Sequence, residues 1–380
     1  MNKKAMVFAF LFIFVGFLGI TAQMKDHEMI RLEKEAMRIQ AEAVTSGYII
    51  YVDATIGNDT TGTGSAKKPF KTINRALSAA RSGDTIKVSP GVYSENLYID
   101  TLDRITFEGA GSDVCILSGY LYTLGCKYLG ITGLKFTGSE AWGTCLWCDN
   151  TDVAVVRDCV FAILGGTGII LEHNSAMWVY NSQLSCTDGS GALSHSFSYL
   201  YLQNCTVTEN WIGIIARRGA LAYADNCTIS NNSGQGAWIH QNAEFWIGTS
   251  SFSNNDVGIW LESGATLNGN RTGASNTIFN NATFGIWLSS GSNAELYCTE
   301  IYNNGTGIYA EKASVLDIRR DNNIYGNSIG IEVTEFAHAF LRNTPIRGNT
   351  LWDVNIHTGG QAICDPSDIG NLQSDCPYCQ

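Results

Sequence analysis

The chain has 380 residues, enough to bury a large hydrophobic core. Only 16% of the residues are charged, and 40 glycines stand against 5 prolines. This composition excludes a disordered or collagen-like chain and favours a β-rich fold with many turns. The formal charge of −11 argues against nucleic acid as a partner, so any acidic ligand would need a local basic site.

The N-terminus has the features of an export signal. Asn2-Lys3-Lys4 precedes an uncharged stretch from Ala5 to Met24, which contains Thr21-Ala22. The pattern predicts a signal peptide over residues 1–22, cleaved near Ala22. Two alternatives stay open. One is an uncleaved anchor through residues 5–24, because twenty residues at about 1.5 Å each span a bilayer. The other is processing at Lys4-Ala5-Met6, which is similar to an archaeal prepilin cleavage site. All three predict a secreted or cell-surface protein.

Residues 23–46 are predicted to form a helical linker or stalk. Their apolar positions step by three and four, with Glu and Lys between them: Met29, Leu32, Ala36, Ile39 and Ala43. Two heptads do not decide between a stalk, a coiled-coil seam and a cap.

Twelve cysteines in an exported chain permit disulfides. A bridge is expected in the C-terminal tail, residues 364–380, which contains Cys364, Cys376 and Cys379. Cys145-Leu146-Trp147-Cys148 has the C-x-x-C spacing of redox motifs. The surrounding sequence shows no thioredoxin-like βαβ pattern, so a disulfide bridge or two free thiols are expected there. No fourth zinc ligand is identified, so no metal site is predicted.

A repeat of 22 to 23 residues dominates the chain from Gly143 to His357. Two further columns keep the same period, an apolar one from Phe161 to Ile346 and an asparagine one from Asn210 to Asn349. Units this short, built from β-branched runs and Gly/Asn turns, bury their apolar face only by stacking. The repeat therefore predicts an all-β right-handed parallel β-helix over residues 47–363. Its glycine column is Gly143, Gly168, Gly191, Gly213, Gly236, Gly258, Gly285, Gly307 and Gly330, followed by Asp353.

The asparagine column has a structural explanation. Asparagine tolerates left-handed turns, and its amide can bond to the identical amide one rung away. We therefore expect these asparagines to support the stacking of the coils.

The segment before the repeat carries distinctive motifs: Tyr51-Val52-Asp53, Gly57-Asn58-Asp59, Lys68-Pro69-Phe70, Gly83-Asp84-Thr85 and Pro90-Gly91-Val92-Tyr93. It resembles the N-terminal segment of many pectin-lyase-like β-helix proteins. The resemblance implies that the Phe70–Ala80 stretch is a short helix capping the open core and that Thr85–Val88 begins the first coil. The physical requirement agrees, because the end of a β-helix exposes apolar core and unpaired strand edge.

The residues after each repeat glycine predict two outward columns on one parallel sheet. In Gly258-Ile-Trp-Leu-Glu262, Ile259 and Leu261 should point inward, and Trp260 and Glu262 outward. The first column is Cys145, Ile170, Leu193, Ile215, Trp238, Trp260, Trp287, Tyr309 and Glu332. The second is Trp147, Glu172, His195, Arg217, His240, Glu262, Ser289, Glu311, Thr334 and His357.

The aromatic part of the first column is a candidate substrate-binding surface, because soluble monomers seldom expose such a hydrophobic strip. Sugar rings stack on aromatic faces, so a polysaccharide could lie along Trp238, Trp260, Trp287 and Tyr309. Cover by a loop, by the N-terminal helix or by a partner is the first alternative. A purely stabilising stack is the second.

The second column holds the candidate catalytic residues Glu172, His195, Arg217, His240 and Glu262. His195 or His240 could remove a proton next to a sugar carboxylate while Arg217 neutralises the developing charge, as in uronate-cleaving lyases. An inverting hydrolase would need two carboxylates, and Glu262 with Glu311, about 9.6 Å apart between backbones, is the nearest fit. Alternatively, the charges only keep an exposed sheet paired and soluble.

The sequence thus favours an exported β-helix that binds an extracellular polysaccharide or surface glycan, with a polysaccharide lyase as its most plausible catalytic form. The alternatives are a non-catalytic adhesin or pilus-like module and a glycoside hydrolase. No cofactor is indicated. Calcium would suit an anionic substrate, but the sequence identifies no calcium site.

Overall fold

The computed structural model describes residues 47–100, 102–138, 143–269, 275–364 and 369–374. The chain divides into two units, Met1–Gly47 and Tyr48–Gln380. The predicted signal peptide and helical linker, residues 1–46, therefore lie outside the described residues. Among the described residues, no helix is long and apolar enough to cross a membrane.

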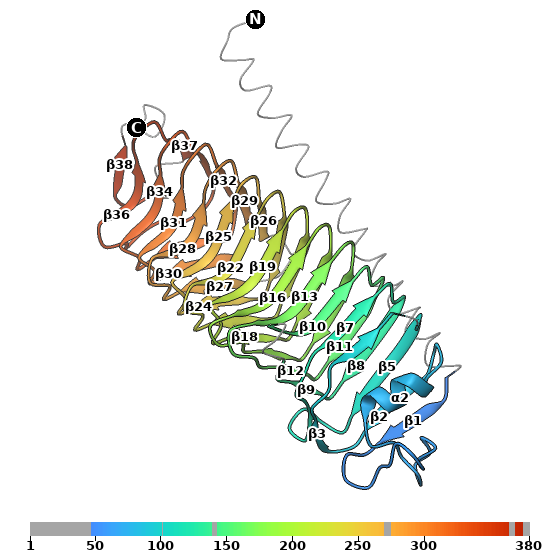
Figure 1. Cartoon of the computed structure of the whole chain (residues 1–380). Helices are drawn as coiled ribbons and strands as arrows, with labels where there is room; N and C mark the ends of the chain where they lie inside the picture. The colour runs from blue at the N-terminus through green and yellow to red at the C-terminus, as the bar shows by residue number, and fades with distance from the viewer. Residues whose placement is uncertain (1–46, 101, 139–142, 270–274, 365–368, 375–380) are drawn as a thin grey trace, which may run out of the picture. The chain divides into compact units, whose positions relative to one another are not determined.

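Three parallel sheets run the length of the second unit, and the chain passes from one to the next on every coil (Figure 1). Sheet 1 contains β1 (Ile49–Val52), β2 (Thr85–Val88), β5 (Arg104–Gly109), β8 (Tyr128–Thr132), β11 (Ala154–Arg157), β14 (Ala176–Tyr180), β17 (Tyr199–Gln203), β20 (Leu221–Asp225), β23 (Glu244–Gly248), β26 (Thr266–Gly269), β29 (Asn293–Leu296), β32 (Val315–Ile318), β35 (His338–Leu341) and β37 (Gln361–Cys364).

Sheet 2, which carries the predicted site, contains β4 (Leu97–Ile99), β7 (Leu121–Leu124), β10 (Thr144–Asp149), β13 (Thr167–Glu172), β16 (Ser190–His195), β19 (Ile212–Arg217), β22 (Gln235–His240), β25 (Val257–Glu262), β28 (Phe284–Leu288), β31 (Thr306–Ala310), β34 (Ile329–Val333), β36 (Trp352–Ile356) and β38 (Leu372–Ser374). The last strand extends the β-helix into the predicted tail.

Sheet 3 contains β3 (Gly91–Tyr93), β6 (Cys115–Leu117), β9 (Lys135–Phe136), β12 (Val160–Phe161), β15 (Gln183–Leu184), β18 (Thr206–Thr208), β21 (Thr228–Ser230), β24 (Ser251–Ser253), β27 (Asn276–Phe279), β30 (Thr299–Tyr302) and β33 (Asn323–Tyr325). Its inward column, from Phe161 to Ile324, is fully buried and pairs in the register that the repeat predicted.

A short helix, α2 (Ile73–Ala79), lies at the N-terminal end of the β-helix beside β1 and β2 (Figure 1). It begins at Thr72, whose side chain accepts a bond from the Arg75 amide, and the Glu95 carboxylate accepts bonds from the Ile73 and Asn74 amides. Ile73 and Ala76 are buried against the core. The predicted capping helix is therefore present, although sheet 1 begins one strand earlier, at β1.

The asparagine column forms a continuous buried ladder, as predicted. Each side-chain amide donates to the side-chain oxygen of the next asparagine, at 2.8 to 3.1 Å, from Asn210 to Asn349. The ladder ends on Asp353, whose Oδ1 accepts from the Asn349 side chain at 2.8 Å. The repeat glycines make room for the ladder, because a Cβ on Gly258 would lie 2.5 Å from the Gly285 oxygen and 3.0 Å from Asn281 Nδ2.

The cysteines divide as the sequence indicated. Cys364 is disulfide-bonded, and the nine other described cysteines are free thiols. Cys145 and Cys148 are both buried, and burial raises the pKa of the Cys148 thiol to about 12. The Cys145-to-Cys148 motif therefore contributes plain core thiols.

Candidate functional site

The five predicted catalytic residues lie on successive strands of sheet 2, from β13 to β25. The register pairs His195 with Arg217, Arg217 with His240, and His240 with Glu262. Glu172 precedes them, with its Oε1 3.2 Å from His195 Nδ1. The predicted alignment is confirmed, and we call these five residues the polar column.

Both histidines of the polar column are held in the neutral form. Burial, followed by the charge of Arg217, lowers the pKa of His240 to about 4. Burial, Arg217 and Arg218 also lower the pKa of His195, and Glu172 only partly opposes them. A neutral imidazole can accept a proton, so the site keeps two potential bases on either side of one permanent cation.

The centre of the site contains polar atoms that find no hydrogen-bond partner among the described residues. Three belong to the polar column, namely His195 Nε2, Arg217 Nε and His240 Nε2, and two are the neighbouring indole nitrogens of Trp238 and Trp260. Arg217 also makes no ion pair with any described carboxylate. Buried polar atoms are usually satisfied by protein or water, so this concentration over four adjacent strands marks a place where a ligand or ordered water belongs.

The first outward column is longer than predicted, and its N-terminal register is corrected. Trp147, not Cys145, pairs with Ile170, and Asp149, not Trp147, pairs with Glu172. The alignment on Gly143 was wrong by two residues, because Cys145 occupies the repeat-glycine position of β10. The column continues backward through Tyr122 to Tyr98. We call the following ten residues the apolar strip: Tyr98, Tyr122, Trp147, Ile170, Leu193, Ile215, Trp238, Trp260, Trp287 and Tyr309.

The rings of the strip are arranged differently in its two halves. Trp238, Trp260 and Trp287 stack on one another, with centroids 5.3 and 4.6 Å apart and planes within 14° of parallel. Trp238 also stacks on His240, at 4.3 Å. The ring faces of this half are therefore occupied by neighbouring rings. The expected stacking of sugars on these faces is not supported, and the tryptophans offer ring edges and N–H groups.

The C-terminal end of the strip is closed by Glu311. This buried carboxylate accepts from Trp287 Nε1 at 3.2 Å, from the Tyr309 hydroxyl at 3.4 Å and from Lys312 Nζ at 3.0 Å. Burial and Glu311 raise the pKa of Tyr309 to about 12. Because three donors hold Glu311, it is unsuited to pair with Glu262 as a hydrolytic acid or base.

The corrected register reveals a cluster that sequence reasoning missed. Asp149, Glu172 and His173 each bring one ligand atom within 4.8 Å of the others. The Asp149 carboxylate already contacts His173 Nδ1 at 2.7 Å and accepts from the Tyr122 hydroxyl at 3.3 Å. These three residues are the described group best able to hold a metal ion. Strand alternation through Trp147 and Asp149, rather than alignment on glycine, would have found them.

A second aromatic column was also missed, on sheet 1. Trp178, Tyr201, Tyr223 and Trp246 pair in register and are buried. The aromatic residues that recur in the corresponding segments were the signal for this column, which lies on a different strand of each coil from the one that follows the repeat glycine.

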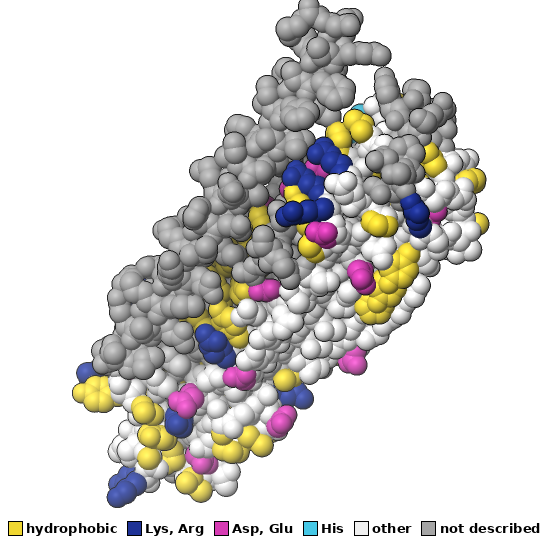
Figure 2. Space-filling view, turned by 180° about the vertical axis from the view of Figure 1, so that it is seen from behind, with side chains coloured by type: hydrophobic (Ala, Val, Ile, Leu, Met, Phe, Trp, Pro, Cys, Tyr) yellow, Lys and Arg dark blue, Asp and Glu magenta, His cyan; other side chains and the backbone are white. Residues whose placement is uncertain are grey.

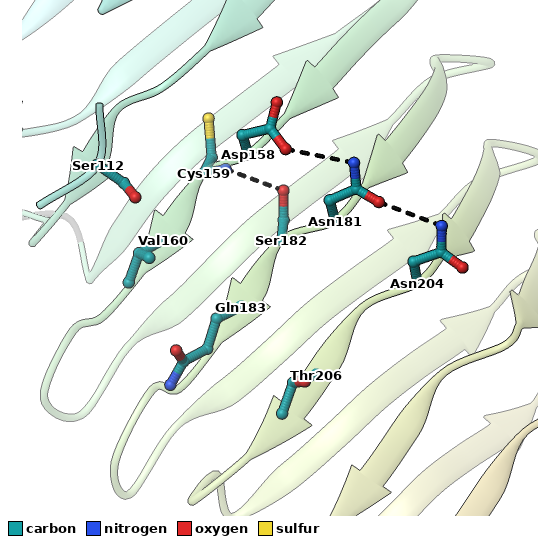
Figure 3. Close-up of a pocket in the computed structure, with 9 residues that line it drawn as sticks. All are labelled: Ser112, Asp158, Cys159, Val160, Asn181, Ser182, Gln183, Asn204 and Thr206. Carbon is teal, nitrogen blue, oxygen red and sulfur yellow. Dashed lines mark hydrogen bonds between the residues drawn. The ribbon is translucent and has the colours of Figure 1, made fainter. Parts of the chain in front are cut away.

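A shallow polar hollow of about 380 Å³ lies at the corner between sheets 1 and 3 (Figure 3). A short external ladder crosses it, in which Asn204 donates to Asn181 at 3.1 Å and Asn181 donates to Asp158 at 3.2 Å. On the face shown in Figure 2, charged side chains are scattered among uncharged ones.

The fold agrees with comparisons to known proteins. The family model "Right handed beta helix region" matches residues 119–272 and 190–351, so the chain belongs to this family. Residues 55–98 match "Protein of unknown function (DUF1565)". No curated protein sequence matches the chain.

Several solved structures share the architecture. The A-module of the Azotobacter vinelandii mannuronan C-5 epimerase AlgE6 is 13% identical, with a TM-score of 0.52 over 80% of this chain and 91% of that one. The AlgE4 A-module from the same organism is 12% identical, with a TM-score of 0.51 over 81% and 92%. Pectate lyase Pel9A is 13% identical, with a TM-score of 0.44 over 84% and 79%. At these identities the similarity to the two epimerase modules, with TM-scores above 0.5, shows the fold alone, and together with the family match it confirms the expected right-handed parallel β-helix.

Proposed function

We propose that the chain binds an acidic polysaccharide across the outer face of sheet 2, with Arg217 as the contact for a sugar carboxylate. The observation that carries this proposal is the Arg217 guanidinium, which pairs with no carboxylate among the described residues and whose Nε is unsatisfied, flanked on adjacent strands by neutral His195 and His240, each with an unsatisfied Nε2. A carboxylate would satisfy the cation, and the hydroxyls of a sugar would satisfy the ring nitrogens.

Two further observations support this assignment. The apolar strip runs beside the polar column, and the buried indole N–H groups of Trp238 and Trp260 are unsatisfied among the described residues. The similar structures with TM-scores above 0.5 are modules of enzymes named for mannuronan, a polysaccharide. We also propose that the chain is exported by its N-terminal segment, because an extracellular glycan requires it.

Proton abstraction is the catalytic form that this geometry favours. In that reaction His240 Nε2 takes the proton from the carbon next to the sugar carboxylate, and Arg217 stabilises the charge that develops on that carboxylate. A carbon–carbon double bond then forms, the bond to the leaving sugar oxygen breaks, and this oxygen takes a proton from water. The remaining hydroxide takes the proton that His240 had removed, which restores the neutral imidazole. The observation behind this form is that His240 is neutral and lies one strand from Arg217.

Calorimetry with polygalacturonate, alginate and a neutral glucan tests the binding proposal. We expect the acidic polymers to bind and Arg217→Gln to weaken binding about tenfold or more, because hydrogen bonds to a charged group contribute about 1.5–3 kcal/mol. Tyr302→Ala, which removes a ring on sheet 3, is the matched control and should bind normally. Equal affinity of wild type and Arg217→Gln would refute the role of Arg217, and no binding to either acidic polymer would refute the function.

The lyase form has its own readout. Ultraviolet absorbance of an unsaturated product should appear with an acidic polymer and disappear in His240→Ala. If wild type binds a polymer but produces no unsaturated ends, the protein is a binding module of the cell surface, which is the second candidate function.

A further inference from the structure

The turn after each strand of sheet 2 contains a position with a left-handed backbone, and Phe197 occupies this position after β16. Its φ is 62°, a conformation that bulky side chains rarely adopt. From β13 to β36 the described coils place glycine or asparagine at this position in all but three cases, as at Gly219 and Asn242. Residues held in such a backbone are concentrated at ligand-binding sites, so the choice of Phe197 points to a function.

The Phe197 ring gains little from packing within the protein. It lies over the next coil, where a Cβ on Gly219 would be only 2.5 Å from Phe197 Cε1. The residue is nevertheless 73% exposed, so most of the ring is in contact with water. A phenyl ring has no hydrogen-bonding group, and a ligand can therefore contact it only through an apolar surface such as the C–H face of a sugar.

Phe197 lies at the edge of the polar column. It follows His195 by two residues, a length of chain that spans at most about 7 Å. The Phe197 amide also donates to the backbone oxygen of Arg218 at 3.1 Å, and Arg218 directly follows Arg217. The charge of Arg218 reaches the centre of the site, because it contributes to the lowered pKa values of His195 and His240. The ring is thus within one or two sugar units of Arg217.

We propose that Phe197 stacks on a sugar of the bound polysaccharide, adjacent along the polymer to the acidic sugar whose carboxylate contacts Arg217. This inference rests on the proposed function of sheet 2. The site then holds two neighbouring sugars by different means, one by its charge and the other by its C–H face. Phe197 is a binding residue, and its unfavourable backbone conformation is retained because the ring contacts the polymer.

Glycine at position 197 separates this function from a role in packing, because glycine removes the ring and adopts the positive φ without strain. Calorimetry with galacturonate and mannuronate tetrasaccharides provides the measurement. We expect Phe197→Gly to bind the preferred tetrasaccharide about three- to tenfold more weakly than wild type, and Phe197→Tyr to bind it normally. The melting temperature of Phe197→Gly should rise by about 1–3 °C, because the strain is relieved.

Phe336 provides the matched control. It has a φ of 64°, is 71% exposed and lies over Gly359, where a Cβ would be 3.0 Å from Phe336 Cε1. It follows β34, five strands or about 24 Å from the strand of Arg217, which is beyond the reach of a tetrasaccharide bound there. Phe336→Gly should therefore raise the melting temperature in the same way and leave the affinity unchanged.

The outcomes separate this inference from the proposed function. If Arg217→Gln weakens binding but Phe197→Gly does not, or if Phe197→Gly and Phe336→Gly lose the same affinity, the stacking contact is refuted while the role of Arg217 stands. A lower melting temperature of Phe197→Gly would show that the ring serves packing, which also refutes the contact. If Arg217→Gln binds like wild type, the proposed function fails and the inference fails with it.

Discussion

His240 shows how a single residue of this fold acquires unusual chemistry. Its ring packs flat against Trp238, is largely withdrawn from water, and lies one strand from Arg217. Both effects disfavour the imidazolium, which is why its pKa falls to about 4. The imidazole is therefore neutral at neutral pH, and the same shift makes it a weaker base than a free histidine.

The same pKa shift links stability to pH. In the unfolded chain, the pKa of His240 returns to about 6.5. Between these two values the unfolded chain binds a proton that the folded chain does not. The free energy of unfolding should therefore fall as the pH drops from about 6.5 to about 4, and the His240 contribution should level off below that.

Urea unfolding of wild type and His240→Gln at pH 7 and pH 5 measures this contribution. The variant should lose less stability than wild type over that interval, because it lacks one of the protons taken up on unfolding. Identical losses in the two proteins would show that His240 has an ordinary pKa in the folded state.

At the scale of elements, the buried asparagine ladder joins seven coils through their side chains. Every amide donates in the same direction, toward the C-terminus, so the last donor needs an acceptor that does not itself donate onward. Asp353 fills this role: its Oδ1 accepts from both the side chain and the backbone of Asn349, and its Oδ2 accepts from the Asn371 amide. The carboxylate thereby connects the ladder to the final coil.

Asp353→Ala should leave two donors of Asn349 buried and unsatisfied. We expect a loss of about 1–3 kcal/mol in the free energy of unfolding. Hydrogen exchange should increase first in β36 and β38, because each coil of a solenoid contacts only its neighbours. Asp158→Gly is the matched control, since Asp158 ends an exposed ladder and glycine adopts its positive φ of 53° without strain, so its loss should cost less than about 0.5 kcal/mol. Equal losses in the two variants would contradict the proposed role of the buried ladder.

The sequence predicted the positions and register of the strands well wherever a residue type recurs for a single physical reason. Gly258 and its equivalents are required by the close approach of the next coil, so their spacing fixed the register from β13 onward. At β10 this constraint is absent, because Cys145 occupies the position that glycine takes in the other coils. Gly143 lies two residues earlier by coincidence, so alignment on it gave the wrong register.

The orientation of the aromatic rings could not be predicted from the sequence, for a different reason. The choice between the parallel stack of Trp260 and the edge-to-face contacts of Tyr122 depends on rotamers and neighbours, which the repeat does not encode.

At the scale of the whole molecule, the chain carries a formal charge of −11 and yet is proposed to bind an acidic polymer. A basic groove would attract such a polymer over a long range, but here the long-range field is repulsive. Attraction is confined to Arg217 and the neutral donors around it, which act only at contact. The local contacts at Arg217 are therefore attractive although the net charge of the chain repels the polymer. Binding should depend more on how well the polymer matches this site than on how much negative charge the polymer carries.

Salt dependence distinguishes this arrangement from a general polyanion-binding surface. The screening length falls from about 30 Å at 0.01 M salt to about 10 Å at 0.1 M, so added salt weakens long-range repulsion more than it weakens a half-buried contact at Arg217. We therefore expect the affinity for an acidic polysaccharide to stay constant or rise over this range, measured by calorimetry at both concentrations. Arg217→Gln should bind more weakly at both. A steep loss of affinity with salt in wild type, the behaviour of proteins that neutralise many anionic groups, would mean that a basic surface other than Arg217 carries the binding.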